Sequence, residues 1–290
     1  MQKKNTVFKV EKENELMKFL MEKMPENSRN SIKSLLTNKR VLVDGKLESQ
    51  YNYKLVPGQE VSISKTRVVS QKLKGVSILF EDNDIIVVEK DKGLLSVGTD
   101  KEKKNTAYSI LKDYLKEQDP KNKIFVVHRL DRDTSGVMIF AKSAKAQDIL
   151  QTNWNDLVKE RSYVALVEGN VKKDRDTIVS YLAENKAYIS YSTDNPEEGK
   201  KAVSNYKVIR RNKNYSLLEV SIETGRKNQI RVHMKELGHS VVGDKKYGAT
   251  KNPINRLGLH AYTIVFTHPI TREVMSFTSK IPTEFLGVFK

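Results

Sequence analysis

Residues 124–141 read IFVVHRLDRDTSGVMIFA, a polar loop between two apolar runs. The loop, residues 128–136, holds one histidine, two arginines, two aspartates, one threonine and one serine in nine positions. The apolar runs are rich in β-branched and aromatic residues, which predicts two strands joined through the loop. Charged side chains in this loop add little buried apolar surface to the core between the two strands. They indicate a functional loop held by a rigid scaffold.

The two aspartates of this loop allow three interpretations. Asp131 lies between Arg129 and Arg132, and Asp133 follows two positions later. Successive side chains of an extended segment point to opposite sides, so Asp131 and Asp133 could share one side and bind Mg²⁺ for phosphoryl transfer. Alternatively, Asp131 is a single catalytic carboxylate kept ionised by a cation. The third interpretation is a loop held by aspartate–arginine bonds alone.

The composition limits the class of protein. The chain has 290 residues, 38% hydrophobic and 30% charged, which suits one large domain or two unequal ones. No apolar run approaches the roughly 20 residues that span a bilayer, and the N-terminus lacks the apolar stretch of a signal peptide. We therefore expect a cytoplasmic protein with no membrane contact. The absence of cysteine excludes disulfides and thiolate chemistry.

The net charge of +16 favours a polyanionic partner, most often nucleic acid. A basic bias that only keeps the protein soluble is the alternative.

Hydrophobic patterns along the chain predict the fold class. Helices are expected over 105–118, 143–160 and 226–238, and strands over 76–90, 161–171, 202–225 and 257–269. Residues 170–200 are less regular. Because hairpins outnumber β-helix-β crossovers, we expect an α+β fold with a mixed, mainly antiparallel sheet and flanking helices.

The first 65 residues resemble a separate module. Two short helices, 15–24 and 28–40, precede a small β ribbon, and Ser28 is a candidate N-cap. This stretch resembles the S-four-type RNA-binding domain, in which a basic helix face docks on structured RNA. The predicted organisation is therefore an RNA-binding domain over 1–65, a linker over 66–75 and a catalytic domain over 76–290. The resemblance assigns RNA binding in the first of these to Arg29, Lys33, Lys39 and Arg40.

A second polar stretch, ETGRKNQIRVHMKELGHSVVGDKKYG, covers residues 223–248. The pattern predicts a helix that opens at Arg226. A cation at a helix N-terminus is unfavourable to the helix dipole, so we expect Arg226 to have an anionic partner elsewhere.

Several blocks together carry a stronger resemblance. HRLDRDTSG, TGRKNQIRVH, GDKKYG and LGLHAYTIVFTHP resemble the RluA-type RNA pseudouridine synthases. KDKGLLSVGTD resembles the early Lys-x-x-Gly-Leu loop of that family, and RSYVALVEG resembles its tyrosine-bearing strand. The blocks occur in the family's order over residues 77–275.

This resemblance implies a role for each matching residue. Asp131 matches the essential catalytic aspartate, Arg231 the arginine that pairs with it, and Tyr163 the tyrosine that stacks on uracil. Arg132 matches the arginine that fills the space left by a flipped base, and Ile230 an apolar residue against the pocket. Further substrate-binding candidates are His128, Arg129 and Arg226.

One departure is Asn228, where many members have histidine, which removes any RNA contact that this histidine makes.

The implied activity is the isomerisation of uridine to pseudouridine in structured RNA, with large-subunit ribosomal RNA favoured and tRNA as an alternative. The reaction needs no cofactor and no metal, and the expected oligomeric state is a monomer. A non-catalytic RNA-binding or ribosome-assembly protein is the alternative from a different class.

Overall fold

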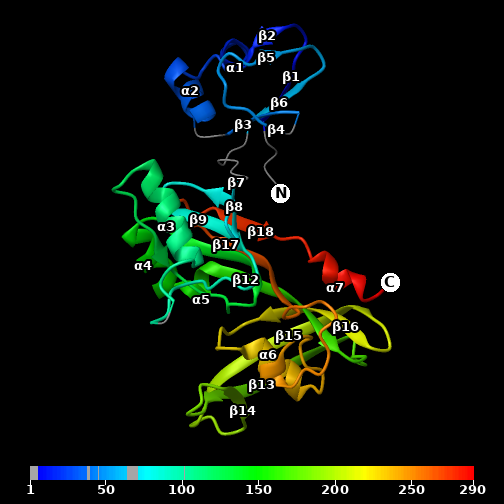
Figure 1. The fold of residues 1–290 in the computed structure, drawn as a ribbon. Helices are drawn as coiled ribbons and strands as arrows, with labels where there is room; N and C mark the ends of the chain where they lie inside the picture. Colours follow the sequence, from blue (N-terminus) through cyan, green and yellow to red (C-terminus); the bar gives the residue numbers. More distant parts are fainter. Residues whose placement is uncertain (1–5, 38–39, 45, 64–70, 101) are drawn as a thin grey trace. The chain divides into compact units, whose positions relative to one another are not determined.

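The computed structural model describes residues 6–37, 40–44, 46–63, 71–100 and 102–290 (Figure 1). The chain divides into two compact units, residues 1–71 with 78–86 and residues 72–77 with 87–290. Half of the predicted linker, residues 66–70, lies outside the described residues, and its residues 71–73 form strand β7 (Gln71–Leu73). The predicted domain boundaries therefore stay a prediction.

The N-terminal residues form two helices and two small sheets. The four-stranded sheet has the order β1-β6-β3-β4, and β2 pairs with β5. Ser28 accepts a hydrogen bond from the Ser31 amide (3.2 Å), as expected of an N-cap. The elements are β1 (Thr6–Lys9), β2 (Asn14–Glu15), α1 (Leu16–Lys23), α2 (Arg29–Thr37), β3 (Val41–Val43), β4 (Lys46–Leu47), β5 (Lys54–Leu55) and β6 (Glu60–Ile63).

Helical spacing explains this core. Leu16, Phe19 and Leu20 lie on one face of α1 because residues three and four apart are neighbours on a helix. They pack with Ile32 and Leu36 of α2 and with buried valines of β3 and β6.

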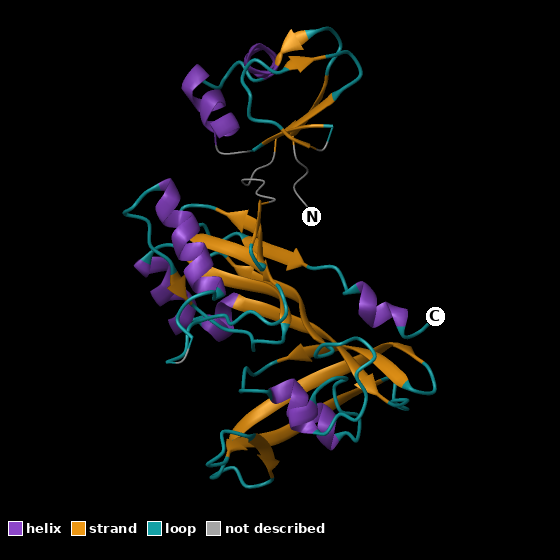
Figure 2. Cartoon of the chain, viewed as in Figure 1, coloured by secondary structure: helices purple, strands orange, loops and turns teal. Residues whose placement is uncertain are grey.

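The remaining residues build one large sheet with helices beside it (Figure 2). Its elements are β8 (Val76–Glu81), β9 (Ile85–Lys90), α3 (Ala107–Gln118), β10 (Phe125–Val126), β11 (Ser135–Ala141), α4 (Ala144–Thr152), α5 (Trp154–Leu157), β12 (Val158–Glu168), β13 (Arg175–Glu184), β14 (Ser190–Thr193), β15 (Lys200–Arg211), β16 (Tyr215–Ile222), α6 (Gln229–Glu236), a 3₁₀ turn (Lys245–Tyr247), β17 (Leu259–Thr267), β18 (Val274–Thr278) and α7 (Thr283–Gly287).

The order of strands in this sheet is β14-β13-β15-β16-β12-β17-β11-β9-β8-β7, with β10 paired to β11 and β18 to β17. Strand β17 pairs with β12 in antiparallel and with β11 in parallel fashion. Helices α4 and α5 contact β11 and β12, whereas α6 contacts β14 and β15 (Figure 1). The predicted α+β class with a mixed, mainly antiparallel sheet is confirmed.

The join between β11 and β17 depends on a glycine. Gly136 has φ +116°, and a Cβ built there would lie 2.1 Å from the Ala261 carbonyl oxygen of β17. Only glycine allows the two backbones to come this close.

Three local predictions need correction. The helix predicted from Arg226 begins at Gln229, because Asn228 has a left-handed backbone (φ 56°) that cannot lie inside an α-helix. The helix predicted to reach residue 160 ends at Leu157, and β12 starts at Val158. Residues 170–200, expected to be less regular than the rest, contain the hairpin of β13 and β14.

Within the described residues no helix is long and apolar enough to cross a membrane.

Candidate active site

Asp131 lies in the loop before β11 and lines a cavity of about 290 Å³, here called the Asp131 cavity. Tyr163 of β12 lines the same cavity, as does Arg231 of α6. The sheet therefore brings together the three residues predicted to be catalytic, although they are far apart in the sequence. Ile230, Arg129 and Arg226 also line this cavity.

Buried polar side chains form hydrogen bonds with the backbone of the loop that carries Asp131. The Ser96 hydroxyl donates to the Leu130 carbonyl oxygen (2.7 Å) and accepts from the Leu130 amide (3.0 Å). Lys90, at the end of β9, is fully buried and its ammonium donates to the carbonyl oxygen of Arg132 at 3.0 Å. The loop is thus held on both sides of Asp131, which fixes the position of its carboxylate.

Lys90 is a residue that sequence reasoning missed as a contributor to the site. Its ammonium also donates to two carbonyl groups of the loop that follows β9. Burial lowers the pKa of Lys90 to about 8, against the raising effect of the Asp133 and Asp131 charges. The position of this lysine in the Lys-x-x-Gly-Leu block was the only signal in the sequence.

The guanidinium of Arg231 reaches the Asp131 carboxylate at 3.4 Å. Its shortest bonds are to Asp244, which accepts from Nε at 2.6 Å and from Nη2 at 2.7 Å. Nη1 also donates to the Asn228 side-chain oxygen at 2.8 Å, and the Tyr247 ring lies 4.8 Å from the guanidinium. Asp244, which sequence reasoning did not assign, is therefore the principal partner of Arg231.

These contacts fix the charge of Arg231. Burial alone would lower the pKa of the guanidinium, but the hydrogen bonds and charge of Asp244, and then the charge of Asp131, raise it above its ordinary value. The side chain of Asp244 is 1% exposed, whereas that of Asp131 is 34% exposed. One carboxylate is thus structural, and the other faces the cavity.

A bulge sets the position of Tyr163. The pairing of β12 with β17 shifts register between Ser162 and Tyr163, so that Ser162 pairs with Thr263 and Tyr163 with Ala261. Bulges of this kind re-aim a side chain next to a site. Burial raises the pKa of the Tyr163 hydroxyl, although the Arg161 charge lowers it, so the phenol keeps its proton at neutral pH.

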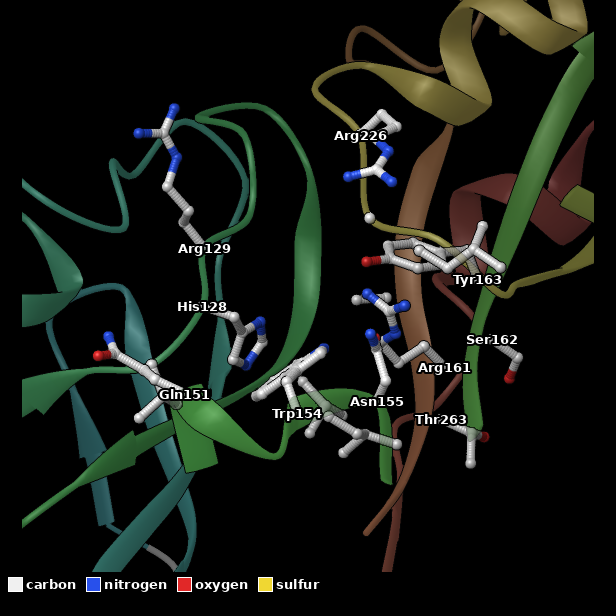
Figure 3. A pocket seen from close by; sticks show the side chains of 16 residues that line it. His128, Arg129, Gln151, Trp154, Asn155, Arg161, Ser162, Tyr163, Arg226 and Thr263 are labelled. Atoms are coloured by element: carbon white, nitrogen blue, oxygen red, sulfur yellow. The ribbon is translucent and has the colours of Figure 1, made fainter. Parts of the chain in front are cut away.

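A second cavity, of about 440 Å³, adjoins the first and is here called the Trp154 cavity (Figure 3). The predicted substrate-binding residue His128 lines it, as do Arg129, Tyr163 and Arg226. His128 accepts a hydrogen bond from the Ile139 amide at 2.9 Å. Burial lowers the pKa of His128 to about 3, so the imidazole is neutral and holds the loop.

Arg132 lies outside both cavities. Its guanidinium binds Glu102 at 2.6 Å, and the Arg132 side chain is 50% exposed. Arg226, placed in a loop by the late start of α6, donates to the Lys201 carbonyl oxygen at 2.9 Å. The expected anionic partner of Arg226 is not seen among the described residues.

The two aspartates of the loop do not share a side. Asp133 lines a different cavity, which also contains Lys92, Lys245 and Arg256. Among the described residues, no group of three or more histidine, aspartate or glutamate side chains is placed to hold a metal ion. The arrangement therefore gives no support to the magnesium interpretation.

The basic residues predicted for the N-terminal module are only partly described. Arg29 and Lys33 are exposed and lie one turn apart on α2, hence on one face. Arg40 is half-buried, and its backbone amide donates to the Leu35 carbonyl oxygen. Lys39 lies outside the described residues.

Comparison with known proteins identifies the family. A model of the RNA pseudouridylate synthase family matches residues 84–236, more than half of the chain. An uncharacterised RNA pseudouridine synthase of Aquifex aeolicus is 34% identical over 306 residues, which cover 97% of this chain and 95% of that protein. The ribosomal large subunit pseudouridine synthase D of Neisseria meningitidis is 31% identical over an alignment that covers 90% of this chain and 74% of the Neisseria protein.

A solved structure agrees in fold. The human RNA pseudouridylate synthase domain containing 4 aligns with a TM-score of 0.60 and 21% identity, over 72% of this chain and 90% of the human chain. The resemblance to RNA pseudouridine synthases is confirmed by the family model and the curated relatives, whereas the S-four-type resemblance of the first 65 residues stays a prediction.

Proposed function

Because the chain belongs to the RNA pseudouridylate synthase family, we propose that it isomerises uridine to pseudouridine in large-subunit ribosomal RNA, with Asp131 as the catalytic residue. The observation that carries the proposal is the cavity where Asp131 and Arg231 meet at 3.4 Å beside Tyr163. Relatives named ribosomal large subunit pseudouridine synthase D favour a ribosomal target. A tRNA target is the second candidate.

The proposed reaction breaks the bond between uracil N1 and the ribose, turns the base and joins its carbon 5 to the same ribose carbon. The proton lost from carbon 5 balances the proton gained at N1, so the product is an isomer. The Asp131 carboxylate assists the cleavage, as a nucleophile or as a base. Arg231, whose charge is secured by Asp244 at 2.6 Å, lies 3.4 Å from that carboxylate and offsets its negative charge.

Tyr163 is the proposed platform for the detached uracil. Stacking on an aromatic ring contributes about 1–3 kcal/mol per base, and the buried phenol stays protonated and can exchange a proton near carbon 5. The target base must leave its stack, at a cost of a few kcal/mol. Arg132 is the proposed wedge that fills the gap, and it must then release Glu102.

The N-terminal module is the proposed docking site for RNA, with Arg29 and Lys33 on the exposed face of α2. Phosphate contacts of this kind add affinity without base specificity. Replacing both residues with glutamine should weaken RNA binding and leave kcat near its original value. The matched control replaces Lys12 and Lys18, which are also exposed. The same loss of binding from both pairs would contradict the proposal.

The decisive experiment measures tritium release from RNA labelled at uracil carbon 5. We expect release from large-subunit ribosomal RNA with the wild-type chain and none with Asp131→Ala. Release from neither ribosomal RNA nor tRNA would refute the enzymatic function and favour a non-catalytic RNA-binding protein. We also propose that the protein acts in the cytoplasm as a monomer, which fractionation and light scattering would check.

A further inference from the structure

Apart from Tyr163, the residues that line the Trp154 cavity have no role in the proposed chemistry, yet this cavity adjoins the Asp131 cavity. Arg129, Tyr163 and Arg226 line both cavities, so a ligand that fills one lies next to a ligand in the other. At about 440 Å³ it is large enough for a nucleotide base. Trp154 is the only tryptophan of the chain, and it is partly exposed.

Trp154 packs against the ring of His128. Its ring lies 4.9 Å from that of His128, centroid to centroid, at an interplanar angle of 40°. His128 in turn is fixed by the Ile139 amide. A preorganised aromatic ring loses little conformational entropy when a base stacks on it.

Arg161 faces the same indole. Its guanidinium carbon lies 5.9 Å from the Trp154 ring centroid. A base sandwiched between two planar groups lies about 3.5 Å from each of them, so the two groups must be about 7 Å apart. The distance between Arg161 and the Trp154 ring must therefore increase by about 1 Å when a base enters. Gly225 leaves room for this guanidinium, since a Cβ there would lie 2.8 Å from Arg161 Nη1. Arginine and aromatic planes are the usual stacking partners of unpaired RNA bases.

The cavity also carries positive charge, and none of the described residues that line it is a carboxylate. Tyr163 lies between the guanidinium groups of Arg161 and Arg226 (Figure 3). Each of these arginines donates to a backbone carbonyl, Arg161 to that of Glu223 (3.2 Å) and Arg226 to that of Lys201 (2.9 Å). In the part of the chain that the structure describes, neither forms an ion pair. Both charges therefore remain available to a phosphate.

Two amide side chains complete the lining. Asn155 and Gln151 are exposed, and the Gln151 amide donates to the Val126 carbonyl oxygen at 2.9 Å. Side-chain amides offer both donors and acceptors to the edge of a base. The cavity thus combines a stacking platform, cations and edge-reading groups.

From this arrangement we infer that the Trp154 cavity is a second nucleotide subsite, which takes the base of the RNA residue next to the target uridine. The base enters between Trp154 and Arg161, and Arg226 binds a phosphate between the two nucleotides. This inference rests on the proposed function. If the inference is correct, the enzyme recognises two unstacked nucleotides of the RNA. One is the target uridine that reacts, and the other is its neighbour, whose base is recognised in the Trp154 cavity.

The test uses the fluorescence of Trp154 in the full-length Asp131→Asn variant, which is expected to bind RNA without turning it over because it lacks the proposed catalytic carboxylate. The RNA is a stem–loop of about 20 nucleotides that releases tritium with the wild-type chain. Two further versions carry an abasic residue immediately before or after the target uridine. Fluorescence anisotropy of a dye at the far end of the stem measures binding independently.

We expect the intact RNA to quench Trp154. One of the two abasic versions should lose that quenching and bind about 5- to 150-fold more weakly, the factor that corresponds to one stacked base. Arg161→Gln in the same background should weaken binding of the intact RNA similarly. The matched control Arg175→Gln, at an exposed arginine remote from this cavity, should not.

Two results would overturn the inference. In the first, the intact RNA binds without changing Trp154 fluorescence. In the second, both abasic versions quench and bind like the intact RNA. Because the RNA is chosen by tritium release, either result removes the subsite and leaves the proposed function standing. Thermal unfolding of each variant separates a loss of fold from a loss of contact.

Discussion

Replacing Asp244 with asparagine tests how the charge of Arg231 is held. The Asp244 side chain is 1% exposed and accepts two bonds from the guanidinium, at 2.6 and 2.7 Å. Asparagine has almost the same shape but no charge, and its amino group meets the donors of the guanidinium. The substitution therefore leaves a mostly buried cation without its principal counterion.

The size of the effect follows from these contacts. Removing one partner of a buried ion pair costs about 3–5 kcal/mol. Arg231 keeps the Asn228 oxygen at 2.8 Å and the Asp131 carboxylate at 3.4 Å, which places the loss near the lower end. We expect about 3 kcal/mol of unfolding free energy, or a Tm lower by about 6–12 °C. A guanidinium displaced by about 1 Å should also lower kcat about 100-fold.

Denaturant unfolding and tritium release measure the two effects. Asp174→Asn is the matched control, because Asp174 pairs with Arg211 at 2.7 Å but is 77% exposed. Exposed pairs contribute less than about 1 kcal/mol, so this variant should keep both its stability and its kcat. If Asp244→Asn were as stable and as active as the control, Asp244 would not hold Arg231, and the reasoning would be wrong.

Three further predictions concern the surroundings of the site. The pKa of Lys90 is about 8 in the folded state and 10.5 when the side chain is exposed, so between pH 8 and pH 10.5 the folded state binds fewer protons than the unfolded state. Over the same pH range the titration of Lys90 by itself raises the free energy of unfolding. We expect kcat to fall above pH 8 in a pH–rate profile. Equal kcat at pH 7 and 9 would contradict it. Glu102→Gln frees Arg132 from a 2.6 Å bond and should tighten RNA binding up to about fivefold by anisotropy; weaker binding would argue against the wedge. Gly136→Ala should lower unfolding free energy by about 4 kcal/mol or more, whereas Gly238→Ala, with open space around it, should cost about 1 kcal/mol in the same melts.

The strands, and the loop that carries the proposed catalytic residue, could be predicted from local patterns. Alternating and continuous apolar runs predict β11, β12 and β17, and the loop composition marks both Asp131 and Asp133. Only the resemblance to the pseudouridine synthases selects Asp131. Serine and threonine before apolar periods mark helix starts, as at Ser143, whose hydroxyl accepts from the Ala146 amide.

The supporting residues could not be predicted in this way. Asp244 lies in a glycine-flanked turn like many surface aspartates, and only the tertiary fold brings it to Arg231. Lys90 resembles an exposed lysine at the end of a strand, although the fold buries it completely. The start of α6 could not be predicted because the helical pattern continues through Asn228, whereas this residue has a left-handed backbone and its side-chain oxygen accepts from Arg231 at 2.8 Å. Each of these roles depends on contacts that form only in the folded structure.

The central place of β17 has a consequence for the order in which a newly made chain becomes active. Asp131 precedes β11 and Tyr163 belongs to β12, and β17 is the strand that lies between β11 and β12 in the sheet. During synthesis β17 is made after both of them. A nascent chain can therefore form its local hairpins early, but it brings Asp131 and Tyr163 together only after residue 267 has emerged from the ribosome. Catalytic competence should appear late and all at once, as expected of long-range strand pairing.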